Sequence, residues 1–192
     1  MELDTPDLRL REFRADDAAA VHSYAGCADN VIFMPWGPNT PERTRAFVET
    51  AMNWATEDPR IHYEVAVILK STGGLIGGCG LVRQGEDAGE LGWGLHRDYW
   101  KRGYGVQMGT ALLEFGFTTL GLHRIQACCD SDNYGSYRVM ERIGMRREGC
   151  FIEARPPSKG SPKPYSDELV YAILRREWKE RQWAAESDPP NR

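Results

Sequence analysis

Residues 90–105, ELGWGLHRDYWKRGYG, carry the most information about how this chain folds. An apolar, strand-like pattern runs into a short loop, in which Gly103 and Gly105 stand two apart, and then directly into an amphipathic segment. Glycine has no Cβ, so backbone N–H groups of such a loop can turn outward together. The first helical turn adds unpaired N–H donors and the positive end of the helix dipole. The segment therefore predicts a strand–loop–helix unit that binds an anion such as pyrophosphate, with Lys101 and Arg102 as cations at its rim.

The sequence before this unit predicts an opening strand, two helices and an antiparallel meander. Thr40 precedes Pro41 at the first position of the second helix, and an aspartate near Asp16 can cap the first. The expected elements are a strand at 8–13, helices from about 16 to 24 and from Thr40 past Trp54, and strands at 63–69, 75–82 and 90–95.

The sequence after the glycine loop predicts a further helix, strand and helix, and then two closing strands. The expected elements are helices at 103–120 and 133–143, strands at 124–129, 145–151 and 168–174, and a short polar helix that ends near Trp183. Residues 153–166 are rich in proline and predict a mobile loop, and residues 184–192 predict a disordered tail. The order indicates an α+β fold whose mixed, mostly antiparallel sheet has about seven strands, in a single domain over residues 1–183.

Composition excludes several classes of protein. Of the 192 residues, 41% are hydrophobic and 27% are charged, values typical of a globular domain and unlike a disordered or fibrous chain. The formal net charge of −4 gives no basic field that would attract nucleic acid or an anionic membrane, so neither is expected as a partner. No apolar run is long enough to span a bilayer.

The five cysteines predict free thiols in a reducing cytoplasm, because their number is odd and no CxxC pair occurs. The adjacent Cys128 and Cys129 lie in an apolar strand without an activating neighbour, which predicts buried structural thiols. The four histidines lie far apart and none is at metal-ligand spacing to a cysteine, so no metal site is expected.

The order of these elements resembles the GNAT N-acetyltransferase superfamily, and within it the branch of the ribosomal-protein alanine N-acetyltransferases. The resemblance covers about residues 5–180. Its elements are the strand LRLREF at 8–13, the strand LIGGCGL at 75–81, YWKRGYG at 99–105, and NYGSYRVMERIGM at 133–145. It implies a central twisted sheet with a splay between its fourth and fifth strands, flanked by four to five helices, in an acetyltransferase that uses acetyl-CoA as donor and an amine as acceptor.

The resemblance also implies roles for individual residues. The pyrophosphate loop corresponds to Arg102 through Val106, with Tyr104 and the two glycines inside it. The acyl group is expected where strand 90–95 diverges from strand 124–129, so that a backbone N–H near Gly94 or Leu95 faces the thioester oxygen. Arg138 and Arg142 are candidates for the 3′-phosphate of CoA.

Two positions depart from the superfamily pattern. Trp100 stands three residues before the first loop glycine, where Gln or Arg is frequent. Met140 stands where many members have a tyrosine that protonates the departing thiolate, and methionine cannot donate a proton. The branch instead implies Ser136 as the hydrogen-bond donor to the CoA sulfur, with Asn133 holding the pantetheine arm; helix capping is the alternative role for Asn133.

A general base is needed because an amine is protonated at neutral pH. Glu90 is the first candidate, His96 the second and Asp167 the third, and Asp167 could instead order the acceptor. Phe33 and Trp36, in a loop broken by proline and glycine, are expected to frame the acceptor.

The favoured hypothesis is an acetyltransferase, monomeric or homodimeric, whose acceptor is a protein or peptide N-terminal amine attacking acetyl-CoA in a ternary complex. A small-molecule amine, such as an antibiotic, a polyamine or an amino acid, is the second candidate acceptor. A non-catalytic sensor of acyl-CoA is an alternative that Met140 motivates. A Rossmann protein is excluded because Met108 occupies the place of the third glycine and no βα units precede the loop.

Overall fold

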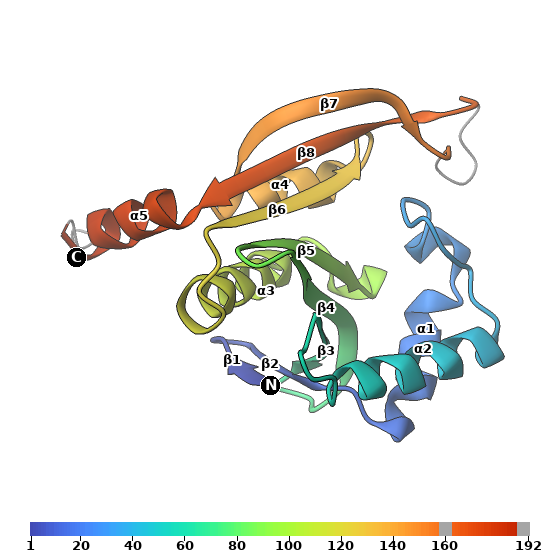
Figure 1. Cartoon of the computed structure of the whole chain (residues 1–192). Helices are drawn as coiled ribbons and strands as arrows, with labels where there is room; N and C mark the ends of the chain where they lie inside the picture. Colours follow the sequence, from blue (N-terminus) through green and yellow to red (C-terminus); the bar gives the residue numbers. More distant parts are fainter. Residues whose placement is uncertain (158–162, 188–192) are drawn as a thin grey trace.

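One eight-stranded sheet organises the chain in a computed structural model that describes residues 1–157 and 163–187 (Figure 1). The strands are β1 (Glu2–Asp4), β2 (Leu8–Glu12), β3 (His62–Leu69), β4 (Leu75–Gln84), β5 (Ala88–Leu95), β6 (Arg124–Asp130), β7 (Arg146–Arg155) and β8 (Ser166–Leu174). The α-helices are α1 (Ala18–Ala25), α2 (Pro41–Trp54), α3 (Tyr104–Glu114), α4 (Tyr134–Arg142) and α5 (Arg175–Ser187). The strand order is β1-β2-β3-β4-β5-β6-β8-β7.

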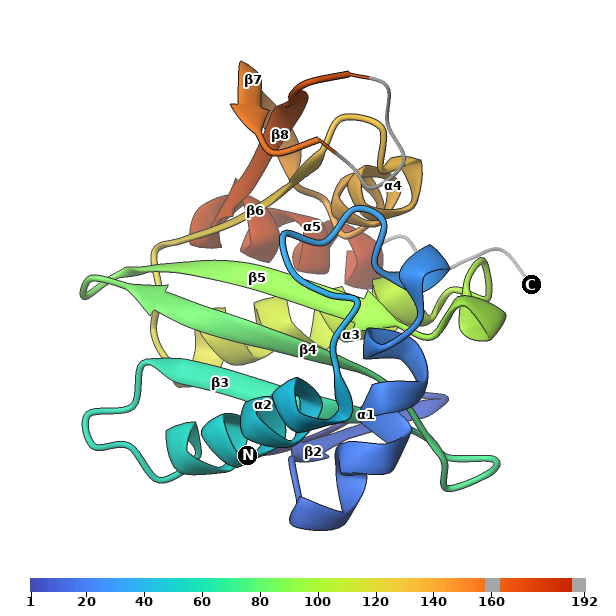
Figure 2. The same ribbon diagram turned by 90° about the vertical axis from the view of Figure 1, so that its right-hand side faces the viewer.

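Strand alternation on β3 divides the apolar side chains between two cores. Val65 and Val67 point to the face that α3 covers, and they join a core that includes Leu112. Ala66 and Ile68 point to the opposite face and join a core with α1 and α2. Figures 1 and 2 show these helices on opposite sides of the sheet.

The sheet splits between β5 and β6, which form its parallel pair. The two strands pair from Ala88↔Arg124 to Leu91↔Ala127, and no pairing continues beyond that point. Residues 92–95 of β5 and 128–130 of β6 therefore diverge (Figure 1). The expected splay between the strands at 90–95 and 124–129 is confirmed.

The N-terminal part of the chain corrects two expectations. β1, a three-residue edge strand, was missed because so short a segment has no readable period, and the sheet has eight strands rather than seven. Asp17 does not cap α1: its carboxylate accepts from the backbone N–H of Arg14, around a 3-10 turn at Ala15–Asp17, and pairs with Arg11 at 2.7 Å. The cap at Thr40 is confirmed, since its hydroxyl accepts from Arg43 N at 3.3 Å.

The C-terminal part is more regular than expected. β7 runs to Arg155 and β8 begins at Ser166, so both ends of the predicted loop at 153–166 belong to strands. α5 continues to Ser187, so the predicted tail is helical over 184–187. The predicted mobility of residues 158–162 and disorder of residues 188–192 lie outside the described residues.

Candidate active site

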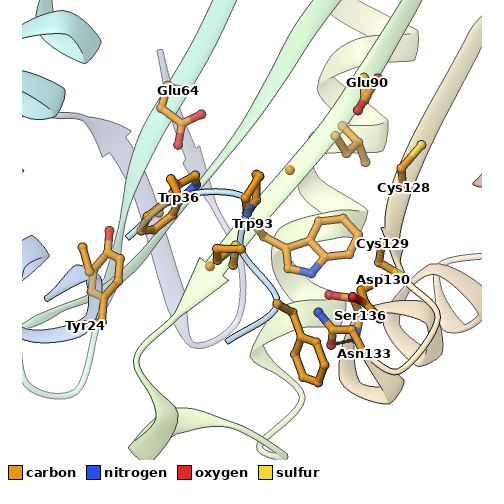
Figure 3. Close-up of a pocket in the computed structure, with 18 of the residues that line it drawn as sticks. Tyr24, Trp36, Glu64, Glu90, Trp93, Cys128, Cys129, Asp130, Asn133 and Ser136 are labelled. Atoms are coloured by element: carbon orange, nitrogen blue, oxygen red, sulfur yellow. Dashed lines mark hydrogen bonds between the residues drawn. The ribbon is translucent and has the colours of Figure 1, made fainter. Parts of the chain in front are cut away.

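A cavity of about 570 Å³ passes through the gap between β5 and β6. Its walls come from both faces of the sheet, with Tyr24 on α1 and Trp54 on α2 at one end and Asn133 and Ser136 on α4 at the other. Figure 3 shows Trp93 in the gap, between Glu64 and the residues of β6 and α4. Splitting the sheet is what opens this space, because a continuous ladder would fill it with backbone.

Several residues expected at the site lie together in this cavity. They are Phe33, Trp36, Glu90, Gly94, Asn133 and Ser136, with Met140, Cys128 and Cys129 also in its wall. Leu95 lies at the end of β5, directly beside them, and Asn30 Nδ2 donates to its carbonyl at 3.0 Å.

Asn133 is the N-cap of α4, and its Oδ1 accepts from the backbone N–H of Ser136 at 3.1 Å. The capping role is therefore present in the structure and orients the first turn of α4 toward the cavity. Ser136 is half-buried, and its hydroxyl has no hydrogen-bond partner among the residues that the structure describes. That hydroxyl is therefore available to a ligand.

Backbone N–H groups point alternately to the two sides of β5, and this contradicts the expectation that the N–H of Gly94 faces the thioester oxygen. The N–H of His96 bonds to Ile76 O on β4 at 2.8 Å, so the N–H of Gly94, two residues before, also points to β4. The intervening N–H groups of Trp93 and Leu95 point to the gap instead. Leu95 therefore remains a candidate donor to a thioester oxygen, and Trp93 joins it.

The carboxylates of the site have different surroundings. Glu90 Oε2 accepts from Gln84 Nε2 at 2.5 Å and from Gln126 Nε2 at 3.1 Å. Glu168 pairs with Arg155 at 2.6 Å. Glu64, on β3, lines the cavity without a hydrogen bond or ion pair to another described residue. Burial raises the pKa of the Glu64 carboxyl to about 7.

Two further base candidates lie elsewhere. His96 Nδ1 accepts from Asp98 N at 3.2 Å beside Tyr99, and its side chain is not part of the cavity wall. Asp167 Oδ1 accepts from Glu153 N at 2.9 Å at the bulged β7–β8 pair, also outside the cavity wall. Asp167 therefore orders this hairpin, and its neighbour Glu168 reaches the cavity.

Burial raises the pKa of the Cys128 thiol to about 11 and that of Cys129 to about 12. Both thiols are therefore protonated at neutral pH. Cys129 is buried as expected, whereas Cys128 is half-buried and lines the cavity.

The glycine loop lies at the N-terminus of α3, next to this cavity but outside its wall. Gly103 is the N-cap with φ +83°, a left-handed conformation that favours glycine. It offers no side chain to the first-turn N–H groups of Tyr104 and Gly105, which leaves them free for an anion. Lys101 and Arg102 are exposed at the rim.

The helices α3 and α4 are in close contact. A Cβ on Gly105 would lie 2.8 Å from Val139, and one on Gly109 would lie 2.9 Å from Ile143, so both glycines permit the approach. Arg138 and Arg142 are exposed on α4. Arg138 also pairs with Glu141 at 2.9 Å. The structure thus sets Val139, next to Arg138 in the sequence, against the first turn of α3, and sets Ile143, next to Arg142, one turn further along α3.

The acetyltransferase (GNAT) domain model matches residues 7–146 of the chain. The chain belongs to the GNAT acetyltransferase family. The GNAT chain is 38% identical over 179 residues to the uncharacterized N-acetyltransferase YnaD of Bacillus subtilis, covering 93% of this chain and 99% of that protein. The matched span contains the opening strand, the glycine loop and most of the cavity wall.

Solved structures share the GNAT architecture. An acetyltransferase of the GNAT family from Bacillus anthracis matches with a TM-score of 0.81 at 36% identity, covering 92% of this chain and 99% of that one. RimL, a ribosomal L7/L12 alpha-N-protein acetyltransferase solved in complex with coenzyme A, matches with a TM-score of 0.75 at 18% identity, covering 91% and 98%. At that identity the second likeness shows the fold alone.

Among the described residues no cluster of His, Cys, Asp and Glu is arranged to hold a metal ion. Within the same part of the chain, no helix combines the length and apolar character that crossing a membrane requires.

Sequence reasoning missed Glu64, Trp93 and the Arg155–Glu168 pair. For Glu64 a signal exists: it is a carboxylate in the apolar run YEVAVIL, and two glycines of the next strand, Gly78 and Gly80, leave it room. That signal becomes readable only with the β3–β4 register.

Proposed function

We propose that this protein transfers the acetyl group of acetyl-CoA to a primary amine, by direct attack of the amine in a ternary complex. The observation that carries the proposal is the cavity through the split sheet, which has an unpaired carboxylate at one end and a free serine hydroxyl at the other. Bringing the two substrates together in one such cavity supplies much of the rate, because the reaction becomes effectively unimolecular.

The residues present fit acetyl-CoA, which supplies the activated acetyl thioester. The free first-turn N–H groups of α3, with Lys101 and Arg102 at the rim, suit its pyrophosphate. Arg138 and Arg142 suit its 3′-phosphate. Asn133 and Ser136 at the start of α4 suit the pantetheine arm and the sulfur, as the sequence resemblance implies.

The cavity offers a group of this chain for each step: attack on the carbonyl, departure of the sulfur and removal of the proton of the amine. The N–H groups of Trp93 and Leu95 point to the gap, where they stabilise negative charge on the carbonyl oxygen during attack. Ser136 donates to the departing sulfur. Glu64 and Glu90 are the two candidate carboxylates for the proton of the amine, and Oε2 of Glu90, the base predicted from sequence, is already bonded to two amides.

Two acceptor classes are open to this site. A protein or peptide N-terminal amine is the acceptor that the sequence resemblance favours, and RimL, which shares the fold, is described as an alpha-N-protein acetyltransferase. A small-molecule amine is favoured by the size of the cavity, which lies in the range of about 300–1,000 Å³ typical of small-ligand sites, and by its aromatic lining.

The test is release of CoA thiol by the purified protein, followed with a thiol reagent, from acetyl-CoA and a panel of amines. The panel holds peptides with N-terminal alanine or serine, the same peptides with blocked N-termini, spermidine, an aminoglycoside and free amino acids. We expect acetyl-CoA consumption that requires an unblocked amine, with one acetyl group added to the acceptor by mass spectrometry. Tight acetyl-CoA binding without acetylation of any amine would instead identify a sensor.

A further inference from the structure

Glu64 on β3 lies at one end of a line of glycines that runs across β4 and β5 to the gap between β5 and β6. In the strand registers Glu64 is opposite Gly80 on β4, and Gly80 is opposite Gly92 on β5. Gly78 and Gly94 form the adjacent pair on the same face. Four neighbouring positions on this face therefore lack side chains, and together they form a glycine floor (Gly78, Gly80, Gly92 and Gly94) beneath the cavity.

The Glu64 side chain lies along this floor toward β5. A Cβ on Gly80 would overlap its carboxylate, and a Cβ on Gly78 would lie 3.6 Å from its Oε1. A Cβ on Gly92 would meet no atom within 4 Å. Since paired Cα atoms of neighbouring strands are about 5.5 Å apart, the carboxylate ends about one strand spacing from β5, with open space between them.

Among the described residues, no ion pair neutralises the charge of Glu64. Tyr24 on α1 lies on its side of the sheet, Cys79 on β4 lies on the opposite face, and Arg43, Glu90 and Arg155 line the same cavity. Burial raises the pKa of the Tyr24 phenol and of the Cys79 thiol, so both are neutral at pH 7. Arg43 is exposed and Glu90 is acidic. Arg155 is paired with Glu168, so a cation from outside the chain is the partner that would neutralise Glu64.

We propose that Glu64 receives the ammonium group of the acceptor across the glycine floor and takes up its proton, and that the acceptor is a primary amine on a compact apolar body. The apolar body follows from the side chains that surround the floor, Phe33, Trp36, Phe47 and Trp54. Both a small arylalkylamine and the N-terminal residue of a peptide carry a primary amine on a compact apolar body. The inference rests on the proposed acetyl transfer.

The step balances without another reactant. The ammonium of the acceptor gives one proton to the Glu64 carboxylate, directly or through one water, and the neutral nitrogen attacks the thioester carbon. The C–N bond forms and the C–S bond breaks. The second proton leaves the nitrogen for the departing sulfur, which yields the amide and CoA thiol. Glu64 then returns its proton to solvent.

The pH dependence of turnover tests the proposal, with 2-phenylethylamine and a peptide with N-terminal alanine as the two probes. A base with a pKa of about 7 is deprotonated above that pH, so kcat/KM for the wild-type protein should fall about tenfold per unit below pH 7. Glu64→Gln should lower kcat/KM about 100-fold or more at pH 8 and move the midpoint of this limb from about 7 to the higher pKa of the acceptor amine, because only the neutral amine can then attack. Glu90→Gln should keep the midpoint near 7. Turnover of 2-phenylethylamine or of the peptide shows whether the acceptor is a small arylalkylamine or a peptide N-terminus.

Gly92→Ala tests the floor separately from the carboxylate. The added methyl group meets no protein atom but takes up the space between Glu64 and the gap, so the KM for the amine should rise at least tenfold while the affinity for acetyl-CoA is kept. Gly149→Ala is the matched control, because Gly149 is also a strand glycine whose Cβ would meet nothing within 4 Å, and it lies on β7 outside the cavity wall. Its kinetics should equal those of the wild type.

Thermal unfolding supplies a readout without substrates. A carboxyl whose pKa is raised on folding, from 4.5 to about 7, costs stability as the pH rises through this interval. Glu64→Gln should therefore unfold at a midpoint about 5 °C or more above the wild type at pH 8, and the difference should shrink as the pH falls and vanish below the unfolded-state pKa of 4.5.

Three results would overturn the proposal while leaving acetyl transfer intact. The first is wild-type turnover by Glu64→Gln with the midpoint of the acidic limb still near pH 7. The second is a shift of that midpoint in Glu90→Gln instead. The third is an equal pH dependence of unfolding in the wild type and Glu64→Gln. Failure of the proposed function itself looks different, because the wild type would then acetylate no amine at any pH.

Discussion

At Ser136 the fold presents a free hydroxyl at the point where the thiolate of CoA is expected to leave. The cap at Asn133 fixes the first turn of α4, so this hydroxyl is held by the backbone rather than by contacts of its own. Met140, one turn further along, is buried and cannot take over as a proton donor. We therefore propose Ser136 as the group that donates a hydrogen bond to the departing sulfur.

Ser136→Ala should lower kcat about 10- to 100-fold, because the departing thiolate loses its hydrogen bond. The dissociation constant of acetyl-CoA should stay within about threefold of the wild type, since hydrogen bonds to a neutral thioester contribute little. Ser131→Ala is the control, because Ser131 lies nearby but outside the cavity wall. Thiol release and calorimetry measure the two quantities. An unchanged kcat would remove Ser136 from the mechanism.

Individual residues were predictable where a local rule governs them. Thr40, Gly103 and Asn133 stand at helix starts, and neighbours in the sequence identify such positions. Glu64 was not predictable as a site residue, because its side chain occupies the space left by Gly78 and Gly80, and only the strand register brings these glycines beside it. Gly94 was assigned to the gap although strand alternation turns its N–H to β4.

At the scale of the elements, β4 and β5 approach so closely that glycine is required between them. A Cβ on Gly77 would overlap the carbonyl oxygen of Gly94 and lie 3.0 Å from Leu95 Cα. These are backbone atoms, and no side-chain rotation can move them away. β5, which carries the gap-facing N–H groups, can therefore pack this close to β4 only because Gly77 has no side chain.

Gly77→Ala should lower the free energy of unfolding by about 2–3 kcal/mol, because the two strands must separate to admit the methyl group. Urea denaturation followed by circular dichroism measures this change. Gly149→Ala should stay within about 0.5 kcal/mol of the wild type, since its added methyl group meets nothing. Equal midpoints for the two variants would show that the β4–β5 spacing does not depend on Gly77.

Strand and helix order was predictable because each long element has a clear period and boundary residues. The three-residue β1 lacks a period, and the ends of β7 and β8 were hidden by the prolines between them. A proline-rich composition predicts a loop, but the β7–β8 hairpin pairs up to Arg155↔Ser166.

At the scale of the molecule, function depends on a sheet that is continuous at one end of β5 and open at the other. Pairing from Ala88 to Leu91 holds the two halves together, and divergence beyond it forms the cavity. The glycine loop of α3 lies beside this opening, so one ligand can contact both. The splay was expected from the family resemblance and not from periodicity. The point where the β5–β6 pairing ends cannot be seen in the sequence of either strand alone.

The most direct test of the account is calorimetric titration of the purified protein with acetyl-CoA and, separately, with free CoA. The account predicts one molecule bound per chain with a dissociation constant in the micromolar range for both ligands, because the α3 loop and the arginines of α4 contact the part that the two ligands share. No detectable heat from a protein that circular dichroism shows to be folded would contradict it. The glycine loop would then be a connection between strand and helix, and the acetyl-transfer proposal would fall with it.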